Sequence, residues 1–290
     1  MDYPTKNDII AAAKDPQFIR DNFFEGCAVK ILPSTRPDMY SGGFSLVFPI
    51  SKGKERWAFK VWYTEIPENQ EKYLKIIEHL EKVNLPYFVK VNYVEKGLLV
   101  LGQFLDTCRM EWIEGLNLSE YISANLYSTA LLEKLAVEFL KLTKDLHLHS
   151  ISHGDLQHEN LIVTQSGEIK IIDYDTICVP SLEGYSCITR GKKGYQHPCR
   201  LIATASSSLQ VDHFSELVIY LSILAVSENP ILWDKYNAVQ AERLVFSQQD
   251  FLNFNDSEIK KDLLLLSNNI QILVKLMEKY IAAHLLLNPI

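Results

Sequence analysis

Three polar residues in one short stretch have the types and the spacing to handle phosphate. Asp155 and Asn160 stand five positions apart in the polar loop 153–160, which precedes an apolar run, and Asp173 follows a second apolar run. Carboxylate and amide oxygens are hard ligands of the kind that Mg²⁺ takes. A carboxylate beside them can accept or orient the proton of a hydroxyl group. The stretch therefore indicates metal-assisted phosphoryl transfer, in which a protein mainly positions groups and neutralises charge.

Two short predicted strands would position these residues. The apolar runs 161–163 and 169–172 flank the turn residues 165–167, a pattern typical of a β-hairpin. We expect this hairpin to deliver all three polar residues to the same edge. Asp and Asn are common in loops, and their five-residue spacing alone is a weak signal. The complete order of loop, strand, turn, strand and carboxylate is far more specific.

The whole stretch resembles the catalytic region of the protein-kinase-like superfamily. His153-Gly154-Asp155 is similar to the catalytic-loop triplet in its His-Gly-Asp form, and Asp173-Tyr174-Asp175 is similar to the Asp-Phe-Gly motif. The resemblance implies that Asp155 is the catalytic base and that Asn160 and Asp173 hold Mg²⁺. It also implies that ATP and Mg²⁺ are the cofactors, with Asn160 counted among the catalytic residues.

Two features nearer the N-terminus resemble the phosphate-binding parts of a kinase. Residues 40–47 form a small-residue turn that feeds an apolar strand, so that backbone N–H groups there can approach phosphates. Gly42 and Gly43 lie in this turn, and Gly42 fits the middle glycine of a kinase glycine-rich loop. Lys60 lies inside the predicted strand 56–62, where burying a lysine is costly unless it is paired. An outward-facing lysine is the alternative; the resemblance implies a catalytic residue that contacts the α- and β-phosphates.

A helix is predicted over residues 67–83, where apolar residues make one face. The resemblance implies that one glutamate of this helix pairs with Lys60 and so supports nucleotide binding. Glu71, Glu78 and Glu81 are the candidates, and spacing does not choose among them. We favour Glu71 because it stands where the apolar face begins. Each of the three has a solvent-facing glutamate as its alternative.

The adenine site is expected at the end of a strand predicted over residues 107–113. Met110, Glu111 and Trp112 resemble the gatekeeper and hinge of a kinase, whose backbone groups bind adenine. Met110 could instead be an ordinary core residue. An extra hairpin is expected around Gly102, before this strand begins.

The C-terminal half reads mainly as helices. The long helix 131–149 resembles the one that leads into the catalytic loop, and Asp212 opens the apolar helix 217–225. The resemblance implies that Asp212 braces the catalytic-loop backbone; an ordinary helix cap is the alternative. Further helices are predicted over residues 7–14, 17–24, 234–244, 258–266 and 269–287.

The sequence departs from the usual kinase pattern at several positions. Gly154 replaces the arginine through which activation-loop phosphate acts, and Cys199 stands where an acidic residue normally follows Pro198. Gln157 replaces the lysine two positions after the catalytic aspartate. A neutral amide cannot neutralise phosphate charge, so we expect transition-state stabilisation to be weaker or to come from elsewhere.

Composition excludes some classes of function. The chain has 290 residues, 47% hydrophobic, with a net charge of −7, which gives no support for nucleic-acid or anionic-membrane binding. Its five scattered cysteines lack any Cys-x-x-Cys pattern, as in a reducing compartment. We see no secretory signal and no membrane-spanning stretch, so we expect a cytoplasmic protein.

These observations predict an α+β protein with a kinase-like two-lobed fold. We expect an N-terminal extension (1–35), a small β-rich N-lobe with one main helix (36–113) and a larger helical C-lobe (114–290). The expected function is that of an atypical bacterial Ser/Thr protein kinase, an ATP-dependent phosphotransferase with a protein substrate. Two alternatives stay open: a small-molecule kinase of the aminoglycoside or choline kind, and a nucleotide-binding pseudokinase scaffold. The sequence does not indicate an oligomeric state.

Overall fold

The computed structural model describes residues 3–187, 189–202, 206–236 and 238–283. The chain divides into two compact units, residues 1–78 with 89–113 and residues 79–88 with 114–290. We call them the sheet unit and the helical unit. The sheet unit holds the five-stranded sheet and the helical unit holds most of the helices, as predicted for an α+β protein. The predicted fold class is therefore confirmed. No helix among the described residues is long and apolar enough to cross a membrane.

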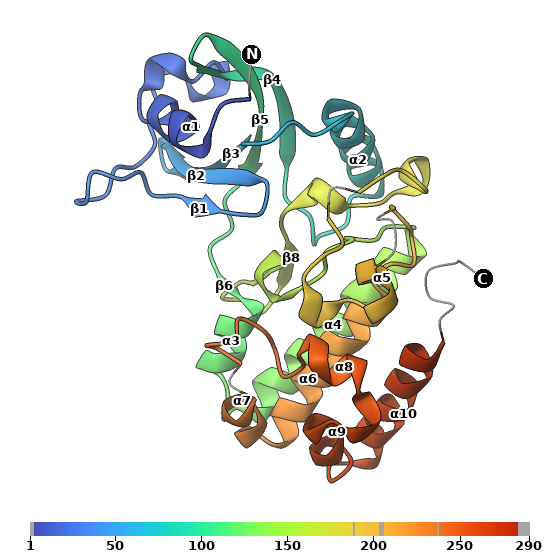
Figure 1. Ribbon diagram of the computed structural model, residues 1–290. Helices are drawn as coiled ribbons and strands as arrows, with labels where there is room; N and C mark the ends of the chain where they lie inside the picture. The colour runs from blue at the N-terminus through green and yellow to red at the C-terminus, as the bar shows by residue number, and fades with distance from the viewer. Residues whose placement is uncertain (1–2, 188, 203–205, 237, 284–290) are drawn as a thin grey trace. The chain divides into compact units, whose positions relative to one another are not determined.

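The sheet unit is built on five antiparallel strands in the order β1-β2-β3-β5-β4 (Figure 1). The middle strand, β3, is buried from Phe59 to Trp62, because neighbours hydrogen-bond to both of its edges and side chains cover its faces. The strands are β1 (Tyr40–Ser41), β2 (Ser45–Lys52), β3 (Glu55–Trp62), β4 (Val91–Val100) and β5 (Gln103–Glu111).

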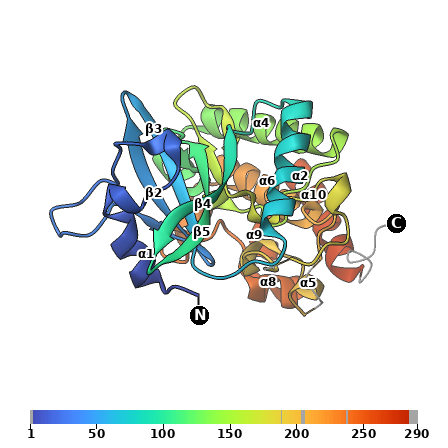
Figure 2. The ribbon, with the colours of Figure 1, turned by 90° about the horizontal axis from the view of Figure 1, so that it is seen from above.

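The N-terminal segment completes the core of the sheet unit. Helix α1 (Lys6–Ala13) begins at a Thr5 capping box and lies against β4 (Figure 2). The helix predicted over residues 17–24 is wrong, because two 3₁₀ turns (Pro16–Phe18 and Asn22–Phe24) stand there with extended backbone between them. An aspartate N-caps each turn, and the extended backbone of the second cap, Asp21, prevents the two turns from joining into one helix. The buried core shared by this segment and the sheet includes Ile9, Ala13, Phe24, Val29, Phe48, Phe59 and Leu98.

Strands β4 and β5 form one long hairpin rather than a small hairpin followed by a separate strand. Their register runs from Val91 opposite Met110 to Val100 opposite Gln103, so the hairpin expected around Gly102 is confirmed. The separate strand expected over 107–113 is wrong, because those residues continue β5 as far as Glu111. Asp106 lies within β5, and its carboxylate accepts hydrogen bonds from Tyr93 Oη (2.6 Å) and from the N–H of Lys96 (2.8 Å) beside a β-bulge.

The helix predicted over residues 67–83 is present as α2 (Asn69–Val83). It starts after Glu68, whose φ of +58° places it outside helical geometry. Buried Tyr73, Ile76 and Leu80 make its apolar face, as the periodicity predicted.

The helical unit holds the predicted hairpin. Strands β6 (Leu116–Asn117), β7 (Leu161–Val163) and β8 (Ile169–Ile171) form a three-stranded sheet in that order. Gly167 has a φ of +86°, which the tight turn between β7 and β8 requires. The predicted hairpin is therefore confirmed.

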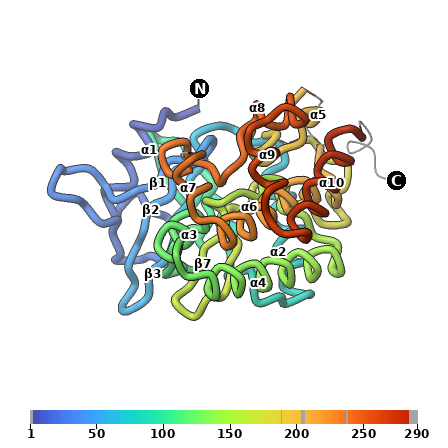
Figure 3. The backbone as a smooth tube through the Cα atoms, turned by 90° about the horizontal axis from the view of Figure 1, so that it is seen from below, coloured from blue at the N-terminus to red at the C-terminus, as the bar shows by residue number. Residues whose placement is uncertain are grey.

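Helix α6 (His213–Glu228) is the centre of the helical unit. Eleven of its residues are buried, on all sides of the helix, as expected for a helix surrounded by protein. Helices α4 (Thr129–Leu148) and α10 (Asn268–Ala282) pack on it (Figure 3). The other helices are α3 (Leu118–Ala124), α5 (Pro198–Ile202), α7 (Ile231–Lys235), α8 (Gln248–Leu252) and α9 (Glu258–Leu263), with 3₁₀ turns at His158–Asn160, Tyr174–Thr176, Pro180–Leu182, Lys193–Tyr195 and Phe254–Asp256.

The helix predicted over residues 234–244 is wrong, because α7 ends at Lys235. Glu242, inside the predicted range, has a φ of +49°, which is outside helical geometry. Predicted helices 258–266 and 269–287 correspond to α9 and α10, and residues 284–287 lie outside the described residues.

Candidate active site

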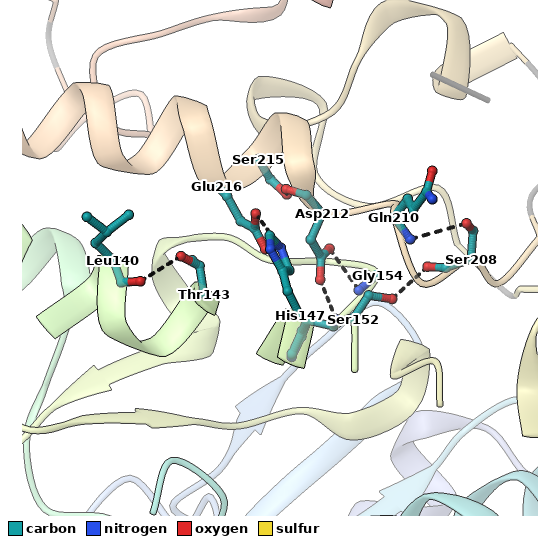
Figure 4. A network of polar contacts seen from close by, with 11 residues as sticks. Leu140, Thr143, His147, Ser152, Gly154, Ser208, Gln210, Asp212, Ser215 and Glu216 are labelled. Carbon is teal, nitrogen blue, oxygen red and sulfur yellow. Dashed lines mark hydrogen bonds and ion pairs between the residues drawn. The ribbon is translucent and has the colours of Figure 1, made fainter. Parts of the chain in front are cut away.

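Asp212 braces the backbone of the loop that precedes β7. Its side chain is 2% exposed, and its carboxylate accepts hydrogen bonds from the N–H groups of His153 and, at 3.0 Å, of Gly154 (Figure 4). It stands directly before α6 but caps none of that helix's N–H groups with its side chain. The bracing contact is therefore confirmed. Asp212 also occupies the N-cap position of α6, as the compatible alternative expected, but only its carbonyl oxygen serves the helix, accepting the N–H of Glu216 at 2.8 Å.

Gly154 occupies a position that only glycine fits. Its φ is +79°, and a Cβ there would lie 2.4 Å from the carbonyl oxygen of Thr176. The loop therefore has no room for the arginine that usually stands here. Arg200 of α5 is 6% exposed and donates from Nη2 to the carbonyl oxygen of Gly154 at 2.8 Å. The positively charged group that reaches the loop is therefore the guanidinium of Arg200 and not a side chain at position 154.

His153 ties the loop to the end of β8. Its Nε2 lies 2.9 Å from the carbonyl oxygen of Ile172, and the N–H of Asp155 donates to its Nδ1 at 3.3 Å. These partners suit a ring that donates from Nε2 and accepts at Nδ1. The hydroxyl of Thr176 donates to the carbonyl oxygen of His153 at 2.8 Å. The loop backbone is therefore fixed from three sides, including Asp212.

Asp155 lies at the tip of this braced loop. Its Oδ1 accepts a 2.8 Å hydrogen bond from the N–H of Lys192, in the segment that precedes α5. Burial raises the pKa of Asp155, the charges of Asp173 and Asp212 raise it further, and the Lys192 hydrogen bond opposes the rise. A carboxyl with a raised pKa is a better proton acceptor than an ordinary surface aspartate.

Asn160 and Asp173 have the donors that Mg²⁺ would need. The side-chain N–H of Asn160 donates to the carbonyl oxygen of Asp155 at 2.8 Å, a bond that uses the amide nitrogen and not Oδ1, the atom that would bind a cation. Asp173 follows β8 with a φ of +63°, and its charge is near enough to raise the pKa of Asp155. Among the described residues, no three His, Cys, Asp or Glu side chains gather to hold a metal. The donor set fits a cation that also takes oxygens from a bound phosphate.

The segment that precedes α5 makes two further contacts with the loop. Lys192 Nζ lies 2.6 Å from Glu159 Oε2. The hydroxyl of Tyr195 lies 2.5 Å from His158 Nδ1 and accepts from the N–H of Leu244 at 3.1 Å. Burial, together with the Lys192 charge, lowers the pKa of His158 to about 4, so this ring is neutral at neutral pH.

Lys60 lies in the sheet unit and is 2% exposed. It pairs with Val47 of β2 and Cys108 of β5, and its Nζ lies 5.7 Å from the centroid of the Trp62 ring. The alternative of an outward-facing lysine is therefore wrong. A lysine this deeply buried is retained only with electrostatic compensation.

Helix α2 leaves the choice of glutamate open. Glu71 accepts from Lys75 Nζ at 2.6 Å, one turn along the helix, and its side chain is 54% exposed. Glu78 and Glu81 are also exposed. The pairing of Glu71 with Lys60 stays a prediction.

The small-residue turn between β1 and β2 is present as expected. The N–H of Gly42 donates to the carbonyl oxygen of Ser45 at 2.9 Å, and the hydroxyl of Tyr63 donates to the carbonyl oxygen of Gly42 at 2.8 Å. A Cβ at Gly43 would meet nothing within 4 Å. The backbone is therefore open on the Gly43 side, where a ligand could approach.

The expected hinge lies at the end of β5. Met110 is 5% exposed, whereas the N–H groups of Glu111 and Trp112 donate to the carbonyl oxygens of Lys90 (3.1 Å) and Arg56 (3.2 Å). Those two N–H groups are therefore already used within the sheet unit.

The family model of the protein kinase domain matches residues 37–282. The chain belongs to this family. The kinase domain is similar to the probable serine/threonine-protein kinase mkcF of Dictyostelium discoideum, with 24% identity over 54% of this chain and 22% of that protein. It is also similar to serine/threonine-protein kinase max-2 of Caenorhabditis elegans (28% identity, 34% of this chain, 14% of that protein) and to serine/threonine-protein kinase SMU1 of Mycosarcoma maydis (28%, 22% and 9%).

The matches bear on the predictions in different ways. The protein-kinase-like resemblance is confirmed by the family match. The matched part is less than a quarter of each of these curated relatives. The roles assigned to individual residues of the kinase domain stay predictions.

Two residues that contact the candidate site of the kinase domain were not identified from the sequence. Lys192 and Arg200 both contact the braced loop, but both lie in the turn-rich segment 176–200, which has no periodicity to place its side chains. The one available signal was the cluster of basic residues at positions 190, 192 and 193.

Proposed function

We propose that this chain is the catalytic domain of an ATP-dependent Ser/Thr protein kinase of an atypical kind. The single observation that carries the proposal is the braced loop, in which Asp212 fixes the backbone that presents Asp155 and Asn160. The family match and the three Ser/Thr kinase relatives support the same class of reaction. The bacterial origin expected from the sequence stays a prediction. The three relatives are eukaryotic.

Asp155 is the proposed base. As the oxygen of an acceptor hydroxyl bonds to the γ-phosphorus of ATP, the hydroxyl proton passes to Asp155. The bond between that phosphorus and the β–γ bridging oxygen breaks, and ADP leaves with its electron pair. Burial keeps the pKa of Asp155 above its ordinary value, which makes the carboxylate a stronger base for this step.

The other predicted residues bind the nucleotide. Asn160 and Asp173 would hold Mg²⁺, which when bound neutralises phosphate charge. Lys60 would hold the α- and β-phosphates, with Glu71 as its expected partner. Gly42 and Gly43 would cover the phosphates with backbone, and Met110 to Trp112 would face adenine.

The direct test is transfer of labelled γ-phosphate with two sets of acceptors run side by side, a protein mixture and a panel of aminoglycosides and choline. We expect Mg²⁺-dependent label on protein Ser or Thr, with loss of transfer when EDTA removes the metal. Label on the small molecules alone would favour the small-molecule kinase. Binding of Mg·ATP without transfer to any acceptor would favour the pseudokinase.

A further inference from the structure

We propose that Lys192 supplies the positive charge beside the transferred phosphoryl group that the loop itself lacks. This inference rests on the proposed kinase function and concerns the same site. It makes Lys192 a catalytic residue delivered by the segment before α5 rather than by the catalytic loop.

Gln157 cannot supply that charge. It is 6% exposed, and its Oε1 accepts the N–H of Glu159 at 2.9 Å, which caps the short turn at residues 158–160. An amide carries no net charge, and this one is already fixed by its own backbone. The loop therefore presents the Asp155 carboxylate without a cation of its own at this position.

Lys192 is fixed next to the same carboxylate. Its backbone N–H donates to Asp155 Oδ1 at 2.8 Å, so its Cα cannot move far from the proposed base. Gly191 permits this close approach: its φ is +80°, and a Cβ there would lie 3.0 Å from Asp155 Oδ1 and 2.5 Å from Gln196 Nε2. A lysine side chain attached at this point has its charge within reach of the site.

The charge of Lys192 already acts on the loop. Its Nζ lies 2.6 Å from Glu159 Oε2, and its side chain is 29% exposed. The charge lowers the pKa of Glu159 and adds to the lowering at His158. The ammonium group therefore lies on the loop side of its segment rather than pointing into solvent.

Glu159 is a partner that Lys192 can leave. The carboxylate is 51% exposed, and ion pairs this open to water contribute little because water and salt screen them. A γ-phosphoryl group carries more charge than one carboxylate and offers several oxygens. The lysine would exchange Glu159 for phosphate when nucleotide is bound, so that its charge acts on the reacting group.

A merely structural role for Lys192 makes a different prediction, so two variants separate the ideas. K192Q removes the charge but keeps the N–H that binds Asp155. E159Q breaks the same ion pair but leaves the lysine. If Lys192 only anchors its segment to the loop, both variants should lose activity equally. If its charge acts on phosphate, only K192Q should lose it.

The experiment measures kcat and KM for ATP in the wild type and four variants, with thermal melts as a check of folding. We expect K192Q to lower kcat about 100-fold with little change in KM, because the charge acts in the transition state. K192R should retain most of the wild-type activity. E159Q should also retain most of the activity that is lost in K192Q. K193Q is the matched control, since Lys193 is the exposed neighbour.

Equal kcat for K192Q and K193Q would overturn the inference, and so would equal losses in K192Q and E159Q. If K192Q is unfolded, the comparison of K192R with E159Q decides in its place: a loss confined to E159Q would overturn the inference. A wild type that transfers no phosphate overturns the proposed function itself. An active wild type with an unaffected K192Q overturns the role of Lys192 alone.

Discussion

At the scale of single residues, Asp212 and Gly154 decide the shape of the catalytic loop. The buried carboxylate of Asp212 accepts hydrogen bonds from two backbone N–H groups of the loop, those of His153 and Gly154. Gly154 supplies the left-handed backbone that this turn of the loop requires. The two residues lead to separate predictions, because Asp212 acts through hydrogen bonding and Gly154 through steric fit.

Replacing Asp212 by asparagine should destabilise the protein by about 2–3 kcal/mol, because two buried N–H groups lose a charged acceptor. Chemical denaturation measures the change. Asp234→Asn is the control, because Asp234 is exposed at the first turn of α7. Indistinguishable denaturation midpoints for the two variants would show that the brace contributes no stability.

Replacing Gly154 by alanine should cost about 3 kcal/mol or more, because the backbone strain of a positive φ adds to a Cβ clash with the carbonyl oxygen of Thr176. Gly184 offers a matched control: its φ is +82°, but a Cβ there would meet nothing within 4 Å. Gly184→Ala should therefore cost only about 1 kcal/mol. The steric account fails if both alanine variants unfold at the same denaturant concentration.

At the scale of elements, an ion pair links α4 to α6 behind the loop. His147 Nε2 lies 2.9 Å from Glu216 Oε1 (Figure 4). The Glu216 hydrogen bond raises the pKa of His147 above 6.5, whereas burial lowers the pKa of the neighbouring His213, whose ring centroid lies 4.7 Å away. Burial raises the pKa of Glu216 in spite of its bond to His147.

The pH dependence of stability follows from the sign of the His147 shift. Because its folded pKa is raised, the stabilisation by protonated His147 is fully present below pH 6.5 and is lost as the pH rises through the folded pKa. His147→Gln should therefore lower the melting temperature at about pH 6 and have little effect at about pH 9. His149→Gln serves as control at the end of the same helix. Parallel melting curves against pH for the wild type and His147→Gln would contradict this account.

At the scale of the whole molecule, the sequence predicted what periodicity and local motifs encode. The hairpin at β7 and β8 and the helices α2 and α4 were found because each depends on residues close together along the chain. The bracing Asp212 lies far from Gly154 in sequence and was found only through the family resemblance. The division into a sheet-rich and a helical part followed from the same patterns.

The failures came from residues whose partners are far away in sequence. Residues 107–113 were expected to form a separate strand, yet β5 runs through Asp106, whose carboxylate is bonded by Tyr93 and Lys96 across the hairpin. A helix was expected over residues 234–244, yet α7 ends at Lys235, and the N–H of buried Leu244 donates to the hydroxyl oxygen of Tyr195. Lys192 could not be placed, because segment 176–200 has no pattern that indicates which of its side chains reach the loop.

The segment before residue 36 is another such case. It has no recognisable motif, but Ile9, Phe24 and Val29 are buried in the core of the sheet unit. Arg109 of β5 forms a two-bonded ion pair with Asp21, at 2.7 and 2.9 Å. The packing role of the segment before residue 36 could not be inferred from sequence, because a short apolar segment indicates burial but not the surface that it covers.

The central claim is that Asp155 on its braced loop performs phosphoryl transfer. The most direct measurement compares γ-phosphate transfer and Mg·ATP affinity in the wild type, Asp155→Asn and the control Asp234→Asn. We expect Asp155→Asn to transfer phosphate about 100-fold to 10,000-fold more slowly while Mg·ATP affinity stays within a few-fold, and Asp234→Asn to match the wild type in both. Transfer by Asp155→Asn at the wild-type rate would contradict the claim.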